Sequence, residues 1–135
     1  MANEAVQVEG PYEVHDFTVA TGTTISGLTL CVLTDPRTAA ASVVTNSGNP
    51  FAGIAATQFV GGKGKVELGL YTKGNFVLTA ATGADINAGD LVTISGANTI
   101  KEAVAADLLS GAIIGKAMEA IASATTGEVK VGEII

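Results

Sequence analysis

The sequence has few of the side chains that usually build an enzyme active site. Its 135 residues include one histidine, one cysteine and no tryptophan, and aromatic residues make up 4% of the chain. A Ser-His-Asp or Cys-His system needs a base beside a nucleophile, and a tetrahedral zinc site needs several Cys or His ligands. His15 lies in the alternating run Tyr12–Phe17, which predicts a surface position on a strand. We therefore expect no catalytic residue.

The glycine-rich and acidic stretches also fall short of known ligand sites. Gly111–Ala117 has three residues between its glycines instead of the four of a phosphate-binding loop, and no Ser or Thr follows Lys116. Asp85 and Asp90 flank a turn but lack the spacing of an EF-hand. These stretches are typical of turns, and we expect no metal and no cofactor.

Positive charge is scarce and scattered. Seven Lys and Arg stand against thirteen Asp and Glu, which gives a net charge of −6. Binding to phosphate backbones needs a clustered basic face, so we expect no nucleic-acid partner. Charged residues make up only 15% of the chain and hydrophobic residues 47%, a balance that excludes an intrinsically disordered protein.

The sequence also lacks signals for export and membrane insertion. Cys31 has no partner for an intramolecular disulfide, and its apolar run Leu28–Leu33 predicts a buried position. Met1–Val6 has neither the basic nor the apolar region of a secretory signal. The uncharged stretch Thr38–Gly62 is interrupted by the turn residues Asn46–Pro50, which excludes a membrane span. We expect synthesis in the cytoplasm.

An internal duplication is visible when the chain is compared with itself at an offset of about sixty residues. Five blocks match in one order: Tyr12 and Phe17 with Tyr71 and Phe76, Ala20–Ile25 with Ala81–Ile86, Leu30 and Val32 with Val92 and Ile94, Gly53 and Ala55 with Gly115 and Ala117, and Gly64–Gly69 with Gly127–Gly132. This pattern predicts one β domain over residues 12–135, made of pseudo-repeat units 12–70 and 71–135. An N-terminal arm, residues 1–11, precedes it.

The periodicity of both units favours strands. Lys65–Leu70 and Glu128–Val131 alternate polar with apolar residues, and Gly, Asn and Asp interrupt the apolar runs at short intervals. This predicts an all-β fold of short antiparallel strands in a sandwich or barrel. One short helix is expected over Lys101–Leu109, ended by Ser110 and Gly111.

Three phrases, Ile86–Val92, Gly115–Ala120 and Gly127–Val131, resemble small capsid decoration proteins, or cement proteins, of tailed bacteriophages. The first unit has Ile25–Leu30 in place of the first phrase. The resemblance implies an all-β structural protein without catalytic activity that binds the outer surface of the capsid and stabilises the shell. It implies a homo-oligomer, commonly a trimer, whose partner is the major capsid protein. Such a protein is made in the host cytoplasm and resides on the virion.

The N-terminal arm supplies the candidate contact residues. Val6, Val8, Pro11 and Tyr12 are the residues that we expect to contact the capsid or a neighbouring protomer. Either the arm becomes ordered on binding or it is a frayed terminus.

Two other functions remain open at this stage. One is a non-catalytic β module of another virion appendage. The other is a glycan-binding domain, which would present exposed aromatic residues drawn from Tyr12, Phe51, Phe59 and Tyr71.

Overall fold

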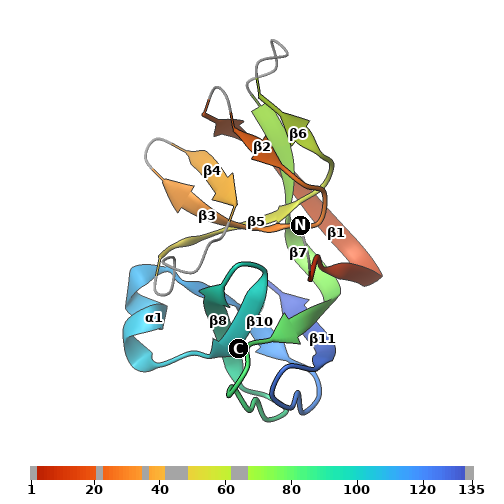
Figure 1. The fold of residues 1–135 in the computed structure, drawn as a ribbon, viewed down its shortest axis with the longest axis vertical. Coiled ribbons are helices and arrows are strands. Elements are labelled where there is room, and N and C mark those ends of the chain that lie inside the picture. Colours follow the sequence, from red (N-terminus) through yellow and green to blue (C-terminus); the bar gives the residue numbers. More distant parts are fainter. Residues whose placement is uncertain (1–2, 21–22, 35–36, 42–48, 62–66, 133–135) are drawn as a thin grey trace.

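The computed structural model describes residues 3–20, 23–34, 37–41, 49–61 and 67–132 and consists of two β lobes stacked along the long axis (Figure 1). The upper lobe contains β1 (Val6–Val19), β2 (Thr24–Ile25), β3 (Leu30–Thr34), β4 (Thr38–Ala41), β5 (Phe51–Ala55) and β6 (Phe59–Val60). The lower lobe contains β8 (Leu91–Gly96), β9 (Thr99–Glu102), α1 (Ala105–Ser110), β10 (Ile113–Ala117) and β11 (Thr126–Val131). The strand β7 (Glu67–Ala80) runs through both.

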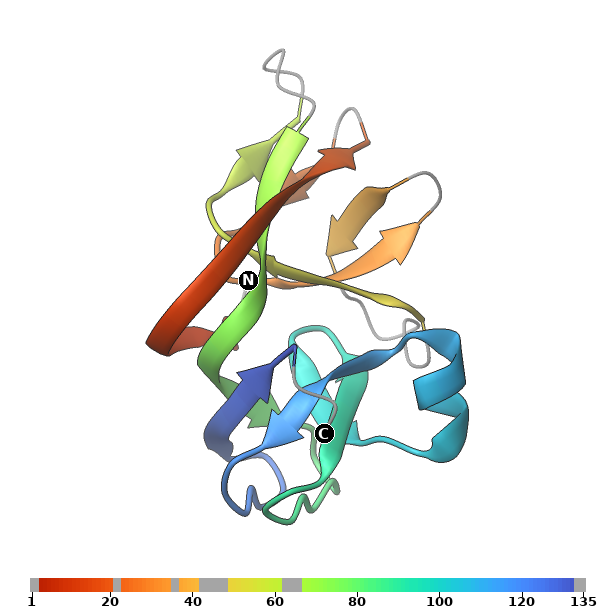
Figure 2. The ribbon, with the colours of Figure 1, turned by 180° about the vertical axis from the view of Figure 1, so that it is seen from behind.

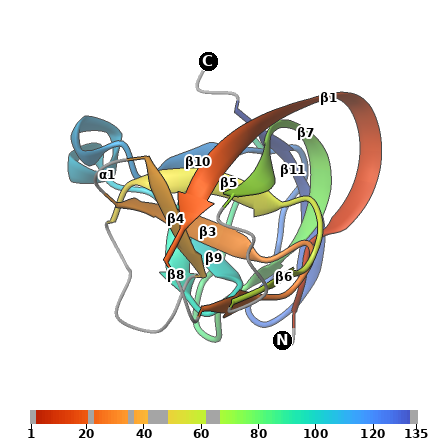
Figure 3. The ribbon, with the colours of Figure 1, turned by 90° about the horizontal axis from the view of Figure 1, so that it is seen from above.

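The strands of the upper lobe close into a ring. β1 pairs in parallel with β4, and β4, β3, β5 and β7 follow as antiparallel neighbours. β7 then pairs antiparallel with β1, which completes a small barrel. The view from above shows how strongly the sheet curls (Figure 3). Closure of this kind leaves few exposed strand edges in the lobe.

The lower lobe closes in the same way around the second part of β7. Here β7 pairs in parallel with β9, and β9, β8, β10 and β11 are antiparallel neighbours. β11 pairs antiparallel with β7 and completes the second barrel. The single long strand therefore belongs to both rings.

The pairing register repeats between the two barrels. Thr18 pairs with Thr38, and the residues 61 positions further along, Thr79 and Thr99, pair with each other. A second pairing is repeated as well. Ile25 pairs antiparallel with Phe59 in the upper barrel, and the equivalent residues of the lower barrel, Ile86 and Ile121, form an antiparallel bridge. The internal duplication is therefore present in the hydrogen bonding as well as in the sequence.

The hydrophobic cores repeat too. The core of the upper barrel contains Val19, Ile25, Cys31, Ala39, Ala52, Ala55, Phe59, Leu68 and Leu70. The core of the lower barrel contains residues 61 or 62 positions later, namely Ala80, Ile86, Val92, Ile100, Ile114, Ala117, Ile121, Val129 and Val131. Both interiors are filled mainly by aliphatic side chains, as the scarcity of aromatic residues requires.

The two barrels share an interface. Leu30, Val32 and Ile54 come from the upper barrel but pack in the core of the lower one. At the same interface the backbone N–H of Leu30 donates a hydrogen bond of 2.9 Å to Oδ1 of Asn98, which is buried in the turn between β8 and β9. Because an unpaired buried amide is costly, this contact fixes how the barrels meet.

The all-β fold with one short helix, predicted from the sequence, is confirmed. The helix is shorter than expected, because Thr99–Glu102 form β9 and α1 begins at Ala105. It ends at Gly111 with φ of 76°, in agreement with the predicted stop. The sequence did not predict the 14-residue lengths of β1 and β7, nor the two parallel pairings. Residues 65 and 66 of one predicted strand lie outside the described residues, and β7 begins at Glu67.

Two equivalent glycines allow neighbouring strands to approach closely. A Cβ on Gly53 would lie 2.7 Å from the carbonyl oxygen of Tyr71, and a Cβ on Gly115 would collide with the carbonyl group of Lys130. Both obstacles are backbone atoms, which cannot move aside without disturbing a ladder. A side chain at either position is therefore excluded by the barrel itself.

We expect the substitution Gly115→Ala to lower the free energy of unfolding by about 3 kcal/mol, because the new methyl group displaces the β11 backbone. Urea unfolding followed by circular dichroism measures this loss. The matched control is Gly27→Ala, whose Cβ would lie 3.6 Å from the nearest atom and should cost less than about 1 kcal/mol. Equal losses for the two variants would contradict the proposed close approach.

Candidate binding surface

The strand β1 forms the most exposed edge of the described structure. It runs along the outside of β7 (Figure 2), from the pair of Val6 with Val77 to the pair of Thr18 with Glu67. The pairing has three register shifts, all between Gln7 and Val14. Within the described residues, the other edge of β1 pairs with β4 only at Thr18 and Val19. Most of that edge therefore makes no strand pairing with the described residues, although Pro11 has no N–H to donate there.

The structure places the predicted contact residues at different depths. Val6 and Val8 lie in β1 with 57% and 46% of their surface exposed, and Pro11 is also exposed. The N-terminal segment is thus part of the sheet from Val6 onward. Val14, which the sequence reasoning did not select, is 50% exposed on the same strand. Its alternation with polar neighbours was the only available signal.

Tyr12 differs from the other three residues. Its ring is half-buried and lies 5.3 Å from the ring of Tyr71 and 5.4 Å from that of Phe76, in tilted and edge-on arrangements. The same ring lies directly over Gly74, where a Cβ would collide with it. Tyr12 therefore ties β1 to β7, and its role in the isolated chain is structural.

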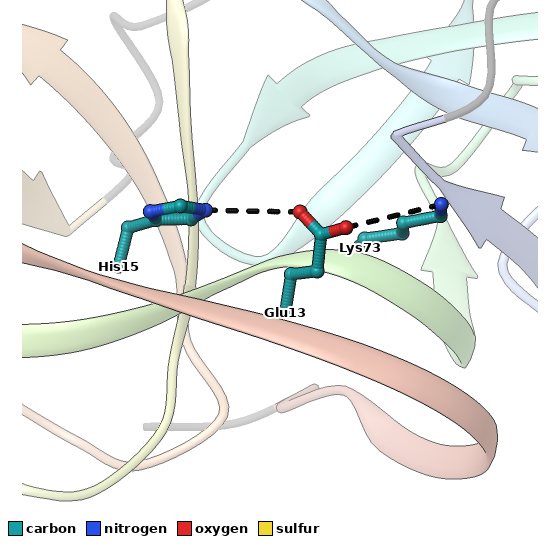
Figure 4. Close-up of polar contacts among 3 residues, drawn as sticks. All are labelled: Glu13, His15 and Lys73. Atoms are coloured by element: carbon teal, nitrogen blue, oxygen red, sulfur yellow. Dashed lines mark ion pairs between the residues drawn. The ribbon is translucent and has the colours of Figure 1, made fainter.

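A chain of polar contacts follows the outer face of β1 (Figure 4). The carboxylate of Glu13 lies 3.7 Å from Nε2 of His15 and 3.9 Å from Nζ of Lys73, which projects from β7. All three side chains are half exposed, so solvent screens these contacts and they add little to stability.

Beside these polar residues lies a groove of about 550 Å³, which we call the β1 groove. It is lined by His15 and Phe17 of β1, Leu33 of β3, Arg37 of the following turn, and Thr72 of β7. The guanidinium carbon of Arg37 lies 5.0 Å from the centre of the Phe17 ring, and Nε of Arg37 donates a 2.8 Å hydrogen bond to the carbonyl of Asp16. The groove thus combines an apolar floor with a positioned cation.

The described residues offer little support for reactive chemistry. They contain no group of three or more His, Cys, Asp or Glu side chains that could hold a metal ion. No helix within those ranges is long and apolar enough to cross a membrane. Cys31 is fully buried, and burial raises the pKa of its thiol to about 12.

The aromatic residues considered for glycan binding do not gather on an open face. Phe59 is fully buried in the upper core, while Tyr71 and Phe51 are half-buried against the lower one. Tyr12 lies in the cluster described above. Carbohydrate platforms need exposed ring faces, so the arrangement gives this function no support.

Comparison with known proteins adds no family to this geometry. The chain matches no family model, and no curated protein matches it.

We expect Cys31 to be inert in the folded chain. With its pKa at about 12, the reactive thiolate is about one part in ten thousand near pH 8, and the side chain is also enclosed. A thiol reagent such as DTNB should react only in urea. Rapid labelling of the native protein at the denatured rate would contradict this burial.

The same thiol predicts a pH dependence of stability. The pKa of the folded group lies above its ordinary value of 9.0, so the unfolded chain loses this proton first and stability falls as pH rises above about 9. Urea midpoints at several alkaline pH values measure the effect. Cys31→Ala lacks this group and should lose less stability over the same range; parallel curves would contradict the assignment.

Proposed function

We propose that this protein is a structural virion protein that binds the outer surface of a tailed-phage capsid as a trimer and stabilises the shell, with no catalytic role. The observation that carries the proposal is the open edge of β1, with its exposed valines. Exposed strand edges and clustered apolar side chains are features that monomeric proteins usually avoid unless another surface covers them. In this proposal the capsid, or a neighbouring protomer, supplies that cover.

The three sequence segments that resemble decoration proteins form part of the lower barrel and do not belong to the β1 surface. Ile86 and Ile121 bridge two loops of the lower barrel, and the N–H of Ala117 donates to the carbonyl of Asp90 at 2.8 Å. Gly115 in turn pairs with Val131. These segments build the second barrel, so the surface that binds the capsid has to be sought elsewhere, and β1 is the best candidate.

The construction of the molecule is compatible with a bracing role. The two barrels share β7 and an apolar interface, so the subunit is one body that can transmit load between capsid subunits. A net charge of −6 favours solubility of the free subunit before assembly. A trimer that engages several capsid subunits gains strength from many modest contacts.

The direct test measures binding to expanded, undecorated heads assembled from the major capsid protein encoded with this chain. Saturation stoichiometry and the thermal stability of the heads are the readouts, and light scattering gives the mass of the free protein. We expect saturable binding and more stable heads. A protein that does not bind these heads would overturn the proposal.

The role of β1 is tested by the double substitution Val6→Asp and Val8→Asp. Placing two charges on the contact surface should weaken head binding about tenfold or more, because apolar contact area is lost and carboxylates are desolvated. Deleting residues 2–10 is less informative, since it also removes the first five residues of β1 and the pairs of Val6, Gln7 and Glu9 with β7.

The matched control for this test is Val104→Asp. Val104 is 65% exposed but precedes α1, away from β1, and its substitution should leave head binding unchanged. Thermal unfolding confirms that all variants are folded. Equal binding by the double variant and the control would remove the β1 edge from the contact surface.

A further inference from the structure

The β1 groove has an equivalent in the lower barrel, and the comparison indicates what it binds. Four of the lining residues, His15, Phe17, Leu33 and Arg37, correspond to Phe76, Leu78, Ile94 and Asn98, each 61 positions later. The pairings of β3 and β4 support this match, since Leu33 pairs with Ala39 as Ile94 pairs with Ile100, and Thr18 pairs with Thr38 as Thr79 pairs with Thr99. Along the other edge of β1 the offset is 59, because Phe17 pairs with Leu68 as Phe76 pairs with Val129, which is the match found in the sequence. We call this region the barrel corner.

In the lower barrel the corner is covered. Phe76, Leu78, Ile94 and Asn98 are all buried, in contact with a core that includes Leu30 and Ile54 of the upper barrel. The side-chain oxygen of Asn98 accepts the N–H of Leu30. The corner of the lower barrel is therefore a contact surface that the upper barrel covers.

In the upper barrel the same corner is open and forms the β1 groove. Its apolar floor is kept, because Phe17 and Leu33 replace Leu78 and Ile94. The other two positions differ in chemistry, since His15 stands in place of a buried phenylalanine and Arg37 in place of a neutral asparagine. The open corner thus keeps the apolar contact and gains an imidazole and a guanidinium cation.

Arg37 occupies its position at a conformational cost. Its φ is 43°, and that of the equivalent Asn98 is 56°. Asparagine adopts this left-handed region readily, whereas arginine seldom does. The left-handed conformation is therefore kept at this position although an unfavourable residue occupies it, which is common at functional positions.

The guanidinium of Arg37 is also positioned in advance. It lies over Phe17, its Nε donates a hydrogen bond to the carbonyl of Asp16, and the side chain lines the groove. Among the described residues neither terminal amino group has a hydrogen-bond partner. The imidazole of His15 contacts Glu13 through Nε2, and its other ring nitrogen points away from Glu13 (Figure 4).

We infer that the β1 groove binds a protein segment in which a carboxylate stands beside an apolar side chain. The apolar side chain packs on Phe17 and Leu33, as Leu30 packs in the lower corner, and the carboxylate accepts hydrogen bonds from Arg37. Arg37 is the cation of the described lining, while the carboxylate of Glu13 already contacts His15 at 3.7 Å, so the positive charge offered to an acidic segment is that of Arg37. This inference holds whether or not the protein binds capsids.

A second copy of this chain fits the groove less well. The surface that covers the lower corner, with Leu30 and Ile54, is already enclosed between the barrels of each molecule. Its equivalent on the lower barrel has Leu91 and Lys116, and Lys116 would bring a positive charge toward Arg37. This surface of a second copy is therefore a poor match, and the occupant that we propose is an acidic segment of a different protein.

The test uses two probes that differ only in charge, N-acetyl-leucine and its neutral amide. Each is titrated into the isotope-labelled full chain while the backbone resonances of the groove residues are followed by NMR. We expect saturable shifts with the acid and about tenfold weaker binding of the amide, which lacks the charge-assisted hydrogen bonds. Equal affinities, or no saturable shifts with the acid, would overturn the inference.

Variants of Arg37 locate the effect. Arg37→Gln should remove the preference for the acid, and Arg37→Lys should retain only part of it, because an ammonium group cannot bind a carboxylate in a bidentate manner. The control Lys116→Ala removes one positive charge from the other barrel and should leave the preference intact. A preference that survives in Arg37→Gln would also overturn the inference, and the two-probe comparison on the unaltered chain decides even if this variant is unstable.

Discussion

The structure depends on one strand that serves two barrels. β7 pairs with β1 and β5 in the upper barrel and with β9 and β11 in the lower one, so neither ring can close without it. Near the middle of β7, Gly74 has a φ of 135°, and the ring of Tyr12 lies directly over it. This strand and the shared core therefore join the two barrels into one body.

The shared strand also makes the duplicated units unequal. Stacking the barrels end to end covers the corner of the lower barrel with the upper one, and nothing in the described chain covers the upper corner. A repeat protein with an open end usually has a polar residue or a partner at that end. Here the open corner keeps Phe17 and Leu33 on its floor and adds Arg37 and His15, which favours a partner over simple solvation.

The sequence predicted the local features of this fold and missed the long-range ones. Alternation in Glu128–Val131 and the spacing of Gly53 and Gly115 predicted strands, turns and the duplication. Closure of each barrel depends on parallel pairs such as Thr18 with Thr38, and such contacts leave no local pattern in a sequence. Val6 and Val8 could be selected from the sequence as contact residues, because they are apolar residues of the N-terminal arm. The placement of Arg37 over Phe17 depends on long-range contacts and could not be predicted.

Both candidate surfaces belong to β1, and this has an energetic consequence. The open edge extends over its N-terminal part, while His15 and Phe17 line the groove nearer its end. β1 is held along β7 and anchored by Tyr12, so neither surface has to fold when a partner arrives. Binding then avoids most of the ordering cost that a flexible arm would incur, and the contact energy of a small interface is retained as affinity. A partner that engages the edge and the groove together would bind one preformed strand at two points, a geometry that favours a fixed orientation on a larger assembly.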